Sequence, residues 1–165
     1  MDQSLSFENG LIELLPRLRR FAHALTRNPA DADDLVQMAI ERALRSQDQW
    51  QPGTRLDSWA YRITRNLWID TVRSRSRKEV FEAPPEEGER VGTDPGETLE
   101  ASADVKRVIA SMQQLPDEQR EVVALILIEG FGYKEVSEML DLPIGTVSSR
   151  LVRGRTALLA MVGER

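Results

Sequence analysis

The segment from residue 79 to residue 104 limits how this chain can fold more than any other feature. It holds nine acidic residues against one basic residue, with three prolines and three glycines, and its apolar residues show no regular spacing until its end. A segment of this composition buries too little apolar surface to offset the entropy lost on ordering. We therefore expect a flexible acidic linker over residues 79–104 that joins two compact units, residues 1–78 and residues 105–165.

The first unit shows the apolar spacing of a small helical bundle. Apolar residues recur at three- and four-residue steps, and breaks at residues 28–29 and 51–54 divide the pattern into three helices. The last of these helices is expected to end near Lys78. Pro16 falls inside the first helix, where it is expected to begin a turn or a kink. The pattern predicts a three-helix bundle.

The second unit is predicted to contain four helices. Its first apolar stripe ends at residues 115–116, and a second helix begins at Asp117 and stops before two glycines. A short helix over residues 133–140, a tight turn and a last helix from Ile144 then have the spacing of a helix-turn-helix. The fold class expected for the whole chain is all-α, with two small helical domains.

The composition argues against several classes of function. The chain has no cysteine and a single histidine, His23, so neither a disulfide framework nor a metal site is expected. It has no glycine-rich phosphate loop, nucleophile motif or convincing acid pair, so we expect neither enzyme activity nor a cofactor. No apolar run approaches the roughly 18 residues of a membrane-spanning helix. We therefore expect a cytoplasmic protein that does not insert into a membrane.

The final helix carries charge of one sign. No acidic residue occurs from residue 142 to residue 163, although the net charge of the whole chain is -5. On a helical wheel Ser149 and Arg153 share one face, and Leu151 lies on the buried side. Short hydroxyls allow close approach to a DNA groove, and arginines bind guanine edges or phosphates, so the pattern favours a recognition helix. The alternative is a solvated basic helix end that complements the helix dipole.

Aromatic and basic residues are interleaved in the third helix of the first unit. Trp59, Tyr61 and Trp68 stand among arginines, and a basic run follows them as far as Lys78. Aromatic rings can stack on exposed bases while arginines contact the backbone, which is a combination suited to opened or single strands. The alternative is that Trp59 and Trp68 are core anchors of the bundle.

An acidic helix start lies at residues 31–37. From the residues alone, we expect its three aspartates to be stabilised by the positive end of the helix dipole, and Leu35 and Val36 to pack in the core.

Together these motifs resemble the extracytoplasmic-function (ECF) sigma factors of bacterial RNA polymerase. The resemblance extends over nearly the whole chain in the order found in the family. It rests on residues 31–37, on residues 59–66 with Asp70 and Arg73, and on residues 145–151 with Arg153 and Arg155. It implies that regions two and four of a sigma factor are joined by the linker, without region three.

The resemblance implies a role for each motif. The first unit would bind the clamp helices in the largest subunit of core RNA polymerase and would recognise and melt the minus-ten element of promoter DNA. The second unit would read the minus-thirty-five element and bind the polymerase flap. The implied polymerase-binding residues are Asp34, Leu35 and Gln37. The implied minus-ten residues are Trp59, Arg62, Arg65, Asn66, Asp70 and Arg73. The implied minus-thirty-five residues are Thr146, Ser148, Ser149, Arg150, Val152, Arg153 and Arg155.

The resemblance further implies an anti-sigma factor as a partner and a part in a stress or envelope response. A competing interpretation is a sigma-like decoy that binds an anti-sigma factor but not DNA. The arginines of the final helix argue against this decoy. An independent helix-turn-helix repressor would leave the first unit and the linker unexplained. Two residues depart from the family pattern: Ser148 stands where many members have a basic residue, and Gly154 where many have alanine. Gly154 is expected to weaken its helix by about 1 kcal/mol relative to alanine.

Overall fold

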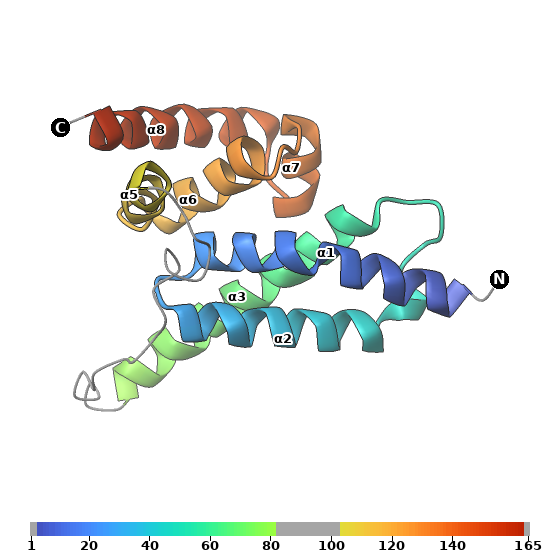
Figure 1. The fold of residues 1–165 in the computed structure, drawn as a ribbon. Helices are drawn as coiled ribbons and strands as arrows, with labels where there is room; N and C mark the ends of the chain where they lie inside the picture. Colours follow the sequence, from blue (N-terminus) through green and yellow to red (C-terminus); the bar gives the residue numbers. More distant parts are fainter. Residues whose placement is uncertain (1–2, 82–102, 164–165) are drawn as a thin grey trace.

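The computed structural model describes residues 3–81 and 103–163, and the regular elements in these two ranges are all helical (Figure 1). The expected all-α fold is therefore confirmed. The N-terminal unit, residues 3–81, consists of α1 (Gln3–Leu25), α2 (Pro29–Arg45), the 3₁₀ helix η1 (Gln47–Gln49) and α3 (Leu56–Phe81). The C-terminal unit, residues 103–163, consists of α5 (Ala103–Met112), α6 (Asp117–Val123), the π-helix η2 (Ala124–Ile128), α7 (Tyr133–Leu140) and α8 (Ile144–Gly163).

Both ends of the predicted linker are helical. The helix α3 continues to Phe81, and α5 already begins at Ala103. The remaining linker residues, 82–102, lie outside the described residues, so the expectation of flexibility there is not addressed. Among the described helices, none is long and apolar enough to cross a membrane.

Of the two alternatives expected at Pro16, a turn or a kink, the turn is absent, because α1 runs through this residue as one helix. A proline removes one backbone hydrogen bond from a helix and costs about 3 kcal/mol in isolation. In α1 the apolar stripe on both sides of Pro16, including Leu11, Leu18 and Phe21, is buried against the rest of the bundle. Packing of this stripe outweighs the local penalty.

The start of α2 follows from three neighbouring residues. Asn28 is in an extended conformation, and its side-chain oxygen accepts a hydrogen bond from the backbone N–H of Ala30 at 2.8 Å. Pro29 occupies the first helical position, where its missing N–H costs nothing. Asp31 lies in the first turn, where a carboxylate is favoured by the helix dipole. The predicted boundary at residues 28–29 is confirmed.

The three helices of the N-terminal unit form a bundle in which α1 and α2 run antiparallel and α3 crosses them (Figure 1). Leu18, Phe21, Leu35 and Tyr61 are at most 2% exposed and form the centre of its core. The predicted three-helix bundle is thus present, and α3 presents one of its sides to the C-terminal unit.

In the C-terminal unit, α7 and α8 form the predicted helix-turn-helix. Asp141 ends α7 in the left-handed conformation, with φ 54° and ψ 51°. The turn is tied by two hydrogen bonds between Ser137 and Leu142: the N–H of Leu142 donates to the carbonyl of Ser137 at 3.0 Å, and the Ser137 hydroxyl donates to the carbonyl of Leu142 at 2.5 Å. These bonds fix the angle at which α8 leaves α7.

Gly154 is required by packing between α6 and α8, contrary to its expected role as a weak point. Its backbone is buried, and a Cβ atom there would lie 2.7 Å from Cγ2 of Val123 and 3.3 Å from Cβ of Gln119. The first distance is too short for any real carbon contact. Alanine would strengthen the isolated helix but would force α8 away from α6.

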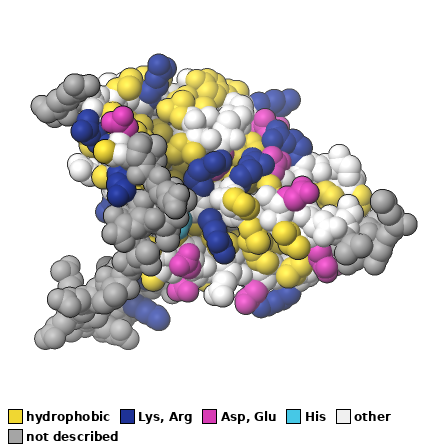
Figure 2. Space-filling model, in the orientation of Figure 1, with side chains coloured by type: hydrophobic (Ala, Val, Ile, Leu, Met, Phe, Trp, Pro, Cys, Tyr) yellow, Lys and Arg dark blue, Asp and Glu magenta, His cyan; other side chains and the backbone are white. Residues whose placement is uncertain are grey.

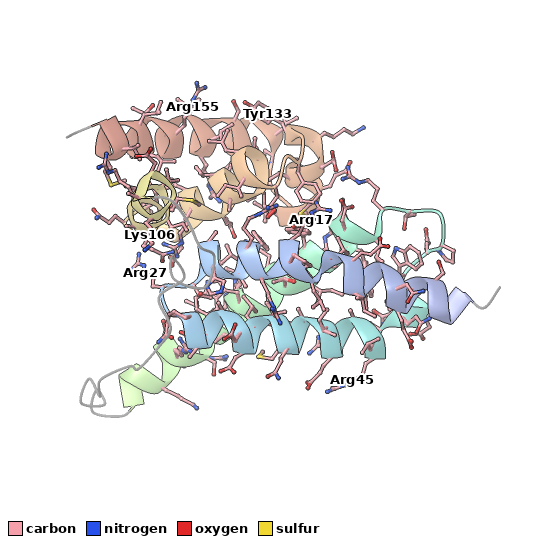
Figure 3. All side chains as sticks on the ribbon, in the orientation of Figure 1. Arg17, Arg27, Arg45, Lys106, Tyr133 and Arg155 are labelled. Atoms are coloured by element: carbon pink, nitrogen blue, oxygen red, sulfur yellow. The ribbon has the colours of Figure 1, made fainter. Side chains whose placement is uncertain are left out.

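The two units pack directly against each other, with the C-terminal unit lying along α1 and α3 (Figure 1). At the centre of this inter-unit interface, the Tyr61 ring lies between Phe21 of its own unit, at 4.9 Å between centroids, and Phe131 of the C-terminal unit, at 5.0 Å. Arg17 lies in the same region (Figure 3), with its guanidinium 5.4 Å from the Tyr61 ring and 6.0 Å from the Phe131 ring.

A buried arginine, Arg120, lies in the same interface at the C-terminal end of α1. Arg120 of α6 is 2% exposed. Its guanidinium donates to the carbonyl of Leu115 at 2.9 Å and, across the interface, to the carbonyl of Leu25 at 3.0 Å, and it also pairs with Asp117. Because Leu25 is the last residue of α1, its carbonyl has no partner within the helix. Arg120 therefore caps α1 from the other unit.

Candidate nucleic-acid interface

The outer face of α8, formed by Ser149, Val152, Arg153 and Arg155, is open to solvent. Val152 is 59% exposed, and Arg153 and Arg155 are also exposed. Arg155 lies on the side of α8 that points away from the N-terminal unit (Figure 3). Among the described residues neither arginine has an ion-pair partner. This face can therefore approach DNA while the two units remain packed together.

The remaining minus-thirty-five candidates are less accessible. Thr146 and Ser148 are half-buried, and the Ser149 hydroxyl donates to the carbonyl of Thr146 at 3.2 Å. Arg150 lies 3.4 Å from Glu118, and its side chain is 23% exposed. Val147 and Leu151 are buried, as the helical wheel predicts. The helix thus separates an open basic face from a face that packs on α6.

Two of the minus-ten candidates are already engaged by the C-terminal unit. The guanidinium of Arg65 donates to both carboxylate oxygens of Glu121, at 3.0 and 3.3 Å. Arg62 donates to the backbone carbonyl of Glu138. The structure thus directs these two side chains to the inter-unit interface.

Trp59 and Trp68 are half-buried in the bundle. The Trp59 ring packs edge-on against Phe7, with 5.7 Å between centroids. The guanidinium of Arg75 lies 5.8 Å from the ring of Trp68. Both side chains therefore contribute to packing, in line with the core-anchor alternative, and both keep a partly exposed surface.

The other minus-ten candidates lie on the exposed part of α3. Asn66, Asp70 and Arg73 are exposed, and the side-chain oxygen of Asn66 accepts a hydrogen bond from Arg65 at 3.4 Å. Because Arg65 contacts both Asn66 and Glu121, release of Arg65 from Glu121 would also alter the surroundings of Asn66.

The three polymerase-binding candidates differ in exposure. Asp34 and Gln37 are exposed on α2, but Leu35 is 2% exposed and belongs to the bundle core. Its side chain cannot contact a partner in this structure. Gln37 instead lines a shallow groove of about 610 Å³ between α1 and α2, together with Leu15 and Ile40. This groove lies away from the C-terminal unit.

Sequence patterns did not reveal the acidic partners of the basic side chains at the inter-unit interface. The carboxylate of Glu129, whose side chain is 0% exposed, accepts from Arg20 at 2.9 and 2.6 Å and from the Tyr61 hydroxyl at 3.1 Å. The hydrogen bond to Glu129 raises the pKa of Arg20. Burial, followed by the nearby charge of Glu129, raises the pKa of the Tyr61 phenol.

Arg55 adds a fourth basic side chain to this region. It pairs with Asp57 at 2.8 Å in its own unit and with Glu135 in the C-terminal unit. We call Arg20, Arg55, Arg62 and Arg65 the arginine face, because all four contact the C-terminal unit. Figure 2 shows basic and acidic side chains gathered where the two units meet. The only indication in the sequence was that Glu129 interrupts an apolar run just before a glycine.

Comparisons with known proteins agree with this division into two units. The sequence profile of Sigma-70 region 2 matches residues 11–78, and that of Sigma-70, region 4 matches residues 106–158. The ECF RNA polymerase sigma factor EcfG of Rhodopseudomonas palustris (strain TIE-1) is 35% identical over 157 residues, which cover 95% of this chain and 85% of that protein.

Two solved structures are similar in fold. The sigma factor RpoE in complex with the anti-sigma factor NepR, from Bartonella quintana, matches with a TM-score of 0.84 and 32% identity over 97% of this chain and 99% of that chain. CnrH in complex with the cytosolic domain of CnrY matches with a TM-score of 0.69 and 24% identity over 98% of this chain and 90% of that chain.

Sigma factors are not enzymes: they bind core RNA polymerase and direct it to promoters. That activity fits the helix-turn-helix with its open basic face, the basic helix α3 and the two matched sigma regions. The chain belongs to the ECF sigma factors of bacterial RNA polymerase and is a transcription initiation factor with regions two and four.

Proposed function

We propose that the two DNA-directed surfaces act on different promoter elements. The outer face of α8 reads the minus-thirty-five element, with Arg153 at base edges and Arg155 at phosphates. The side of α3 that carries Arg62 and Arg65 contacts the minus-ten element. The observation that carries the first assignment is that Arg153 and Arg155, on the second helix of a helix-turn-helix, are exposed and have no ion-pair partner within residues 3–81 and 103–163.

We propose residues 1–78 as the polymerase-binding and minus-ten unit, with Asp34 and Gln37 in contact with the clamp helices. Both side chains are exposed on α2, on a surface that the C-terminal unit does not cover. Residues 105–165 would form the minus-thirty-five unit and would contact the flap. Residues 79–104 would connect them across the polymerase surface.

We also propose that an anti-sigma factor binds this chain and that its promoters serve a stress or envelope response. The support is the similarity of both units together, over 97% of the chain, to RpoE in its complex with the anti-sigma factor NepR. A decoy without DNA binding is disfavoured, because the α8 face retains two exposed arginines.

Run-off transcription with core polymerase from the host and a promoter library tests this function. The purified chain, without any inhibitory partner, is expected to select start sites preceded by a common pair of promoter elements. Arg45→Ala is the matched control for loss of an arginine from the outer face of α8, as in Arg153→Ala. Arg45 is exposed on α2, and its side chain points away from α8 (Figure 3). Failure of the wild-type chain to select any start site would reject the assignment.

A further inference from the structure

The arginine face meets a set of negatively charged groups from one continuous stretch of the C-terminal unit. Glu121 lies in α6, Glu129 follows η2, and Glu135 lies in the first turn of α7. We call these three residues the acidic face. Each binds one arginine of the N-terminal unit: Glu121 binds Arg65, Glu129 binds Arg20, and Glu135 binds Arg55.

The contacts have the geometry that arginine also uses with phosphate. Arg20 and Arg65 each approach two oxygens of one carboxylate, at distances between 2.6 and 3.3 Å. Arginine forms the same paired hydrogen bonds with a phosphate group. Arg62 donates to a carbonyl in the last turn of α7, which carries the negative end of that helix dipole.

Two of the three carboxylates of the acidic face are enclosed by the packing of the two units, whereas the Glu135 side chain is 36% exposed. The side chains of Glu121 and Glu129 are 6% and 0% exposed, so these groups face the N-terminal unit and not solvent. The Arg65 side chain is itself only 21% exposed. A DNA phosphate cannot take the place of Glu121 on Arg65 while the units remain in contact.

We propose that the acidic face is an internal substitute for promoter phosphates, which occupies the arginine face until the two units separate. The proposal rests on the proposed role of Arg62 and Arg65 at the minus-ten element. Separation would free the arginines for DNA and the glutamates for solvent in the same step. Such charge pairs favour one relative placement of the two units, because any other placement would leave charges buried without a partner, which is costly.

The π-helix η2 places the central part of the acidic face. The N–H of Glu129 donates to the carbonyl of Ala124 at 2.9 Å, five residues earlier, and the N–H of Phe131 donates to the carbonyl of Leu125 at 3.0 Å. This wider turn brings Glu129 to Arg20 and Phe131 to Tyr61 together. Since π-turns are rare and frequently lie at functional sites, η2 supports a selected role for this contact.

The test removes the three charges and keeps the shapes. The full chain with E121Q/E129Q/E135Q is compared with wild type for binding to a fluorescein-labelled single-stranded DNA of mixed sequence, 20 nucleotides long. The affinity is expected to rise about tenfold, because phosphate contacts by freed arginines dominate such binding. Adding Arg65→Gln to the triple variant is expected to reverse most of the gain.

A control of equal net charge separates release of the arginines from a general loss of repulsion. The variant E8Q/E13Q/E41Q loses three acids that are exposed on α1 and α2. Its DNA affinity is expected to change by less than about threefold. Equal gains in both triple variants would overturn the proposal.

Opening is measured in the same proteins by energy transfer between dyes. The chain has no cysteine, so the exposed positions Gln49 and Ala160 can be labelled specifically as Q49C and A160C. Transfer is expected to fall in the E121Q/E129Q/E135Q background. If it falls without a gain in DNA affinity, or if neither changes, the acidic face is not a phosphate substitute. Promoter-specific run-off transcription by the wild-type chain in either case would leave the proposed function intact.

Discussion

The outer face of α8 and the side of α3 that carries Arg62 and Arg65 are both proposed to touch the promoter, yet the structure presents them in opposite states. Arg153 and Arg155 extend into solvent. Arg62 and Arg65 are held by the C-terminal unit. Under the proposed assignments, the first surface can reach DNA in the closed chain, whereas the second becomes accessible only when the units separate. Duplex contact through α8 and strand capture through α3 would then be controlled separately.

The largest effect on this comparison is expected from Arg120→Met, which removes the buried cation between α6 and the end of α1. The carbonyls of Leu25 and Leu115 would lose their donor in a buried setting, and a loss of about 3 kcal/mol in the free energy of unfolding is expected. Urea denaturation followed by circular dichroism measures it.

Asp117→Asn is the matched control for Arg120→Met, because the Asp117 side chain is 63% exposed. It removes the negative charge that pairs with the same guanidinium and uncovers no carbonyl, so a loss below about 1 kcal/mol is expected. Equal losses in the two variants would mean that Arg120 acts through its ion pair and not by capping α1.

A second effect is expected at the open surface. Arg153→Ala should lower promoter-specific transcription about 5- to 150-fold, the cost of one lost base contact of about 1–3 kcal/mol. Binding to core polymerase should stay unchanged, because Arg153 lies on α8 and far in sequence from Asp34 and Gln37. Run-off assays and polymerase pull-down measure the two properties. Unchanged transcription would break the contrast between the surfaces.

A third prediction concerns how α8 is held. Gly154→Ala should reduce the free energy of unfolding by about 1–3 kcal/mol, because its methyl group would overlap Cγ2 of Val123. Val123→Ala removes that atom, so the double variant should be more stable than the sum of the two single changes predicts. Thermal unfolding of the four proteins measures the coupling. Additive losses would show that α6 and α8 adjust without strain.

These cases show where sequence patterns suffice. Helix boundaries depend on residues close in the sequence, so the start of α2 could be predicted from Asn28 and Pro29. The three- and four-residue steps of apolar residues in α1 likewise predicted which side of the helix is buried. Gly154 was misjudged because helix propensity is local, whereas the atom that demands glycine belongs to Val123 in another helix. Ala32, Leu35 and Ala39 follow the spacing of a buried stripe, and the core position that the residues alone predict for Leu35 is confirmed.

The inter-unit interface could not be predicted from the sequence. The partners Arg65 and Glu121 are 56 positions apart, and Arg20 and Glu129 are 109 positions apart. No periodicity links such residues. In the sequence, each of these acids looks like an ordinary solvent-exposed residue on a helix surface. The exposure of Arg153 and Arg155 was easier to predict, because the helical wheel of a single helix determines it.

The smallest expected effect is a pH dependence from His23, which lines a cavity of about 350 Å³ between α1 and α5. Burial, more than the nearby Arg19, lowers the pKa of His23 below 6.5, although Asp33 opposes the shift. The folded chain thus binds this proton less readily than the unfolded chain. Its stabilising contribution is complete above pH 6.5 and is lost as the pH falls through the lowered pKa.

The urea midpoint of the wild-type chain should therefore decrease more between pH 7.5 and pH 5.5 than that of His23→Gln, in which the other titrating groups are retained. Because His23 lies beside Val108 and Met112 of the C-terminal unit, the energy transfer between labels at positions 49 and 160 should also fall over this interval. That result would make closure of the two units sensitive to acid, while the exposed α8 face would keep its affinity for duplex DNA. Parallel pH profiles of the two proteins would instead place His23 outside the groups that couple the units.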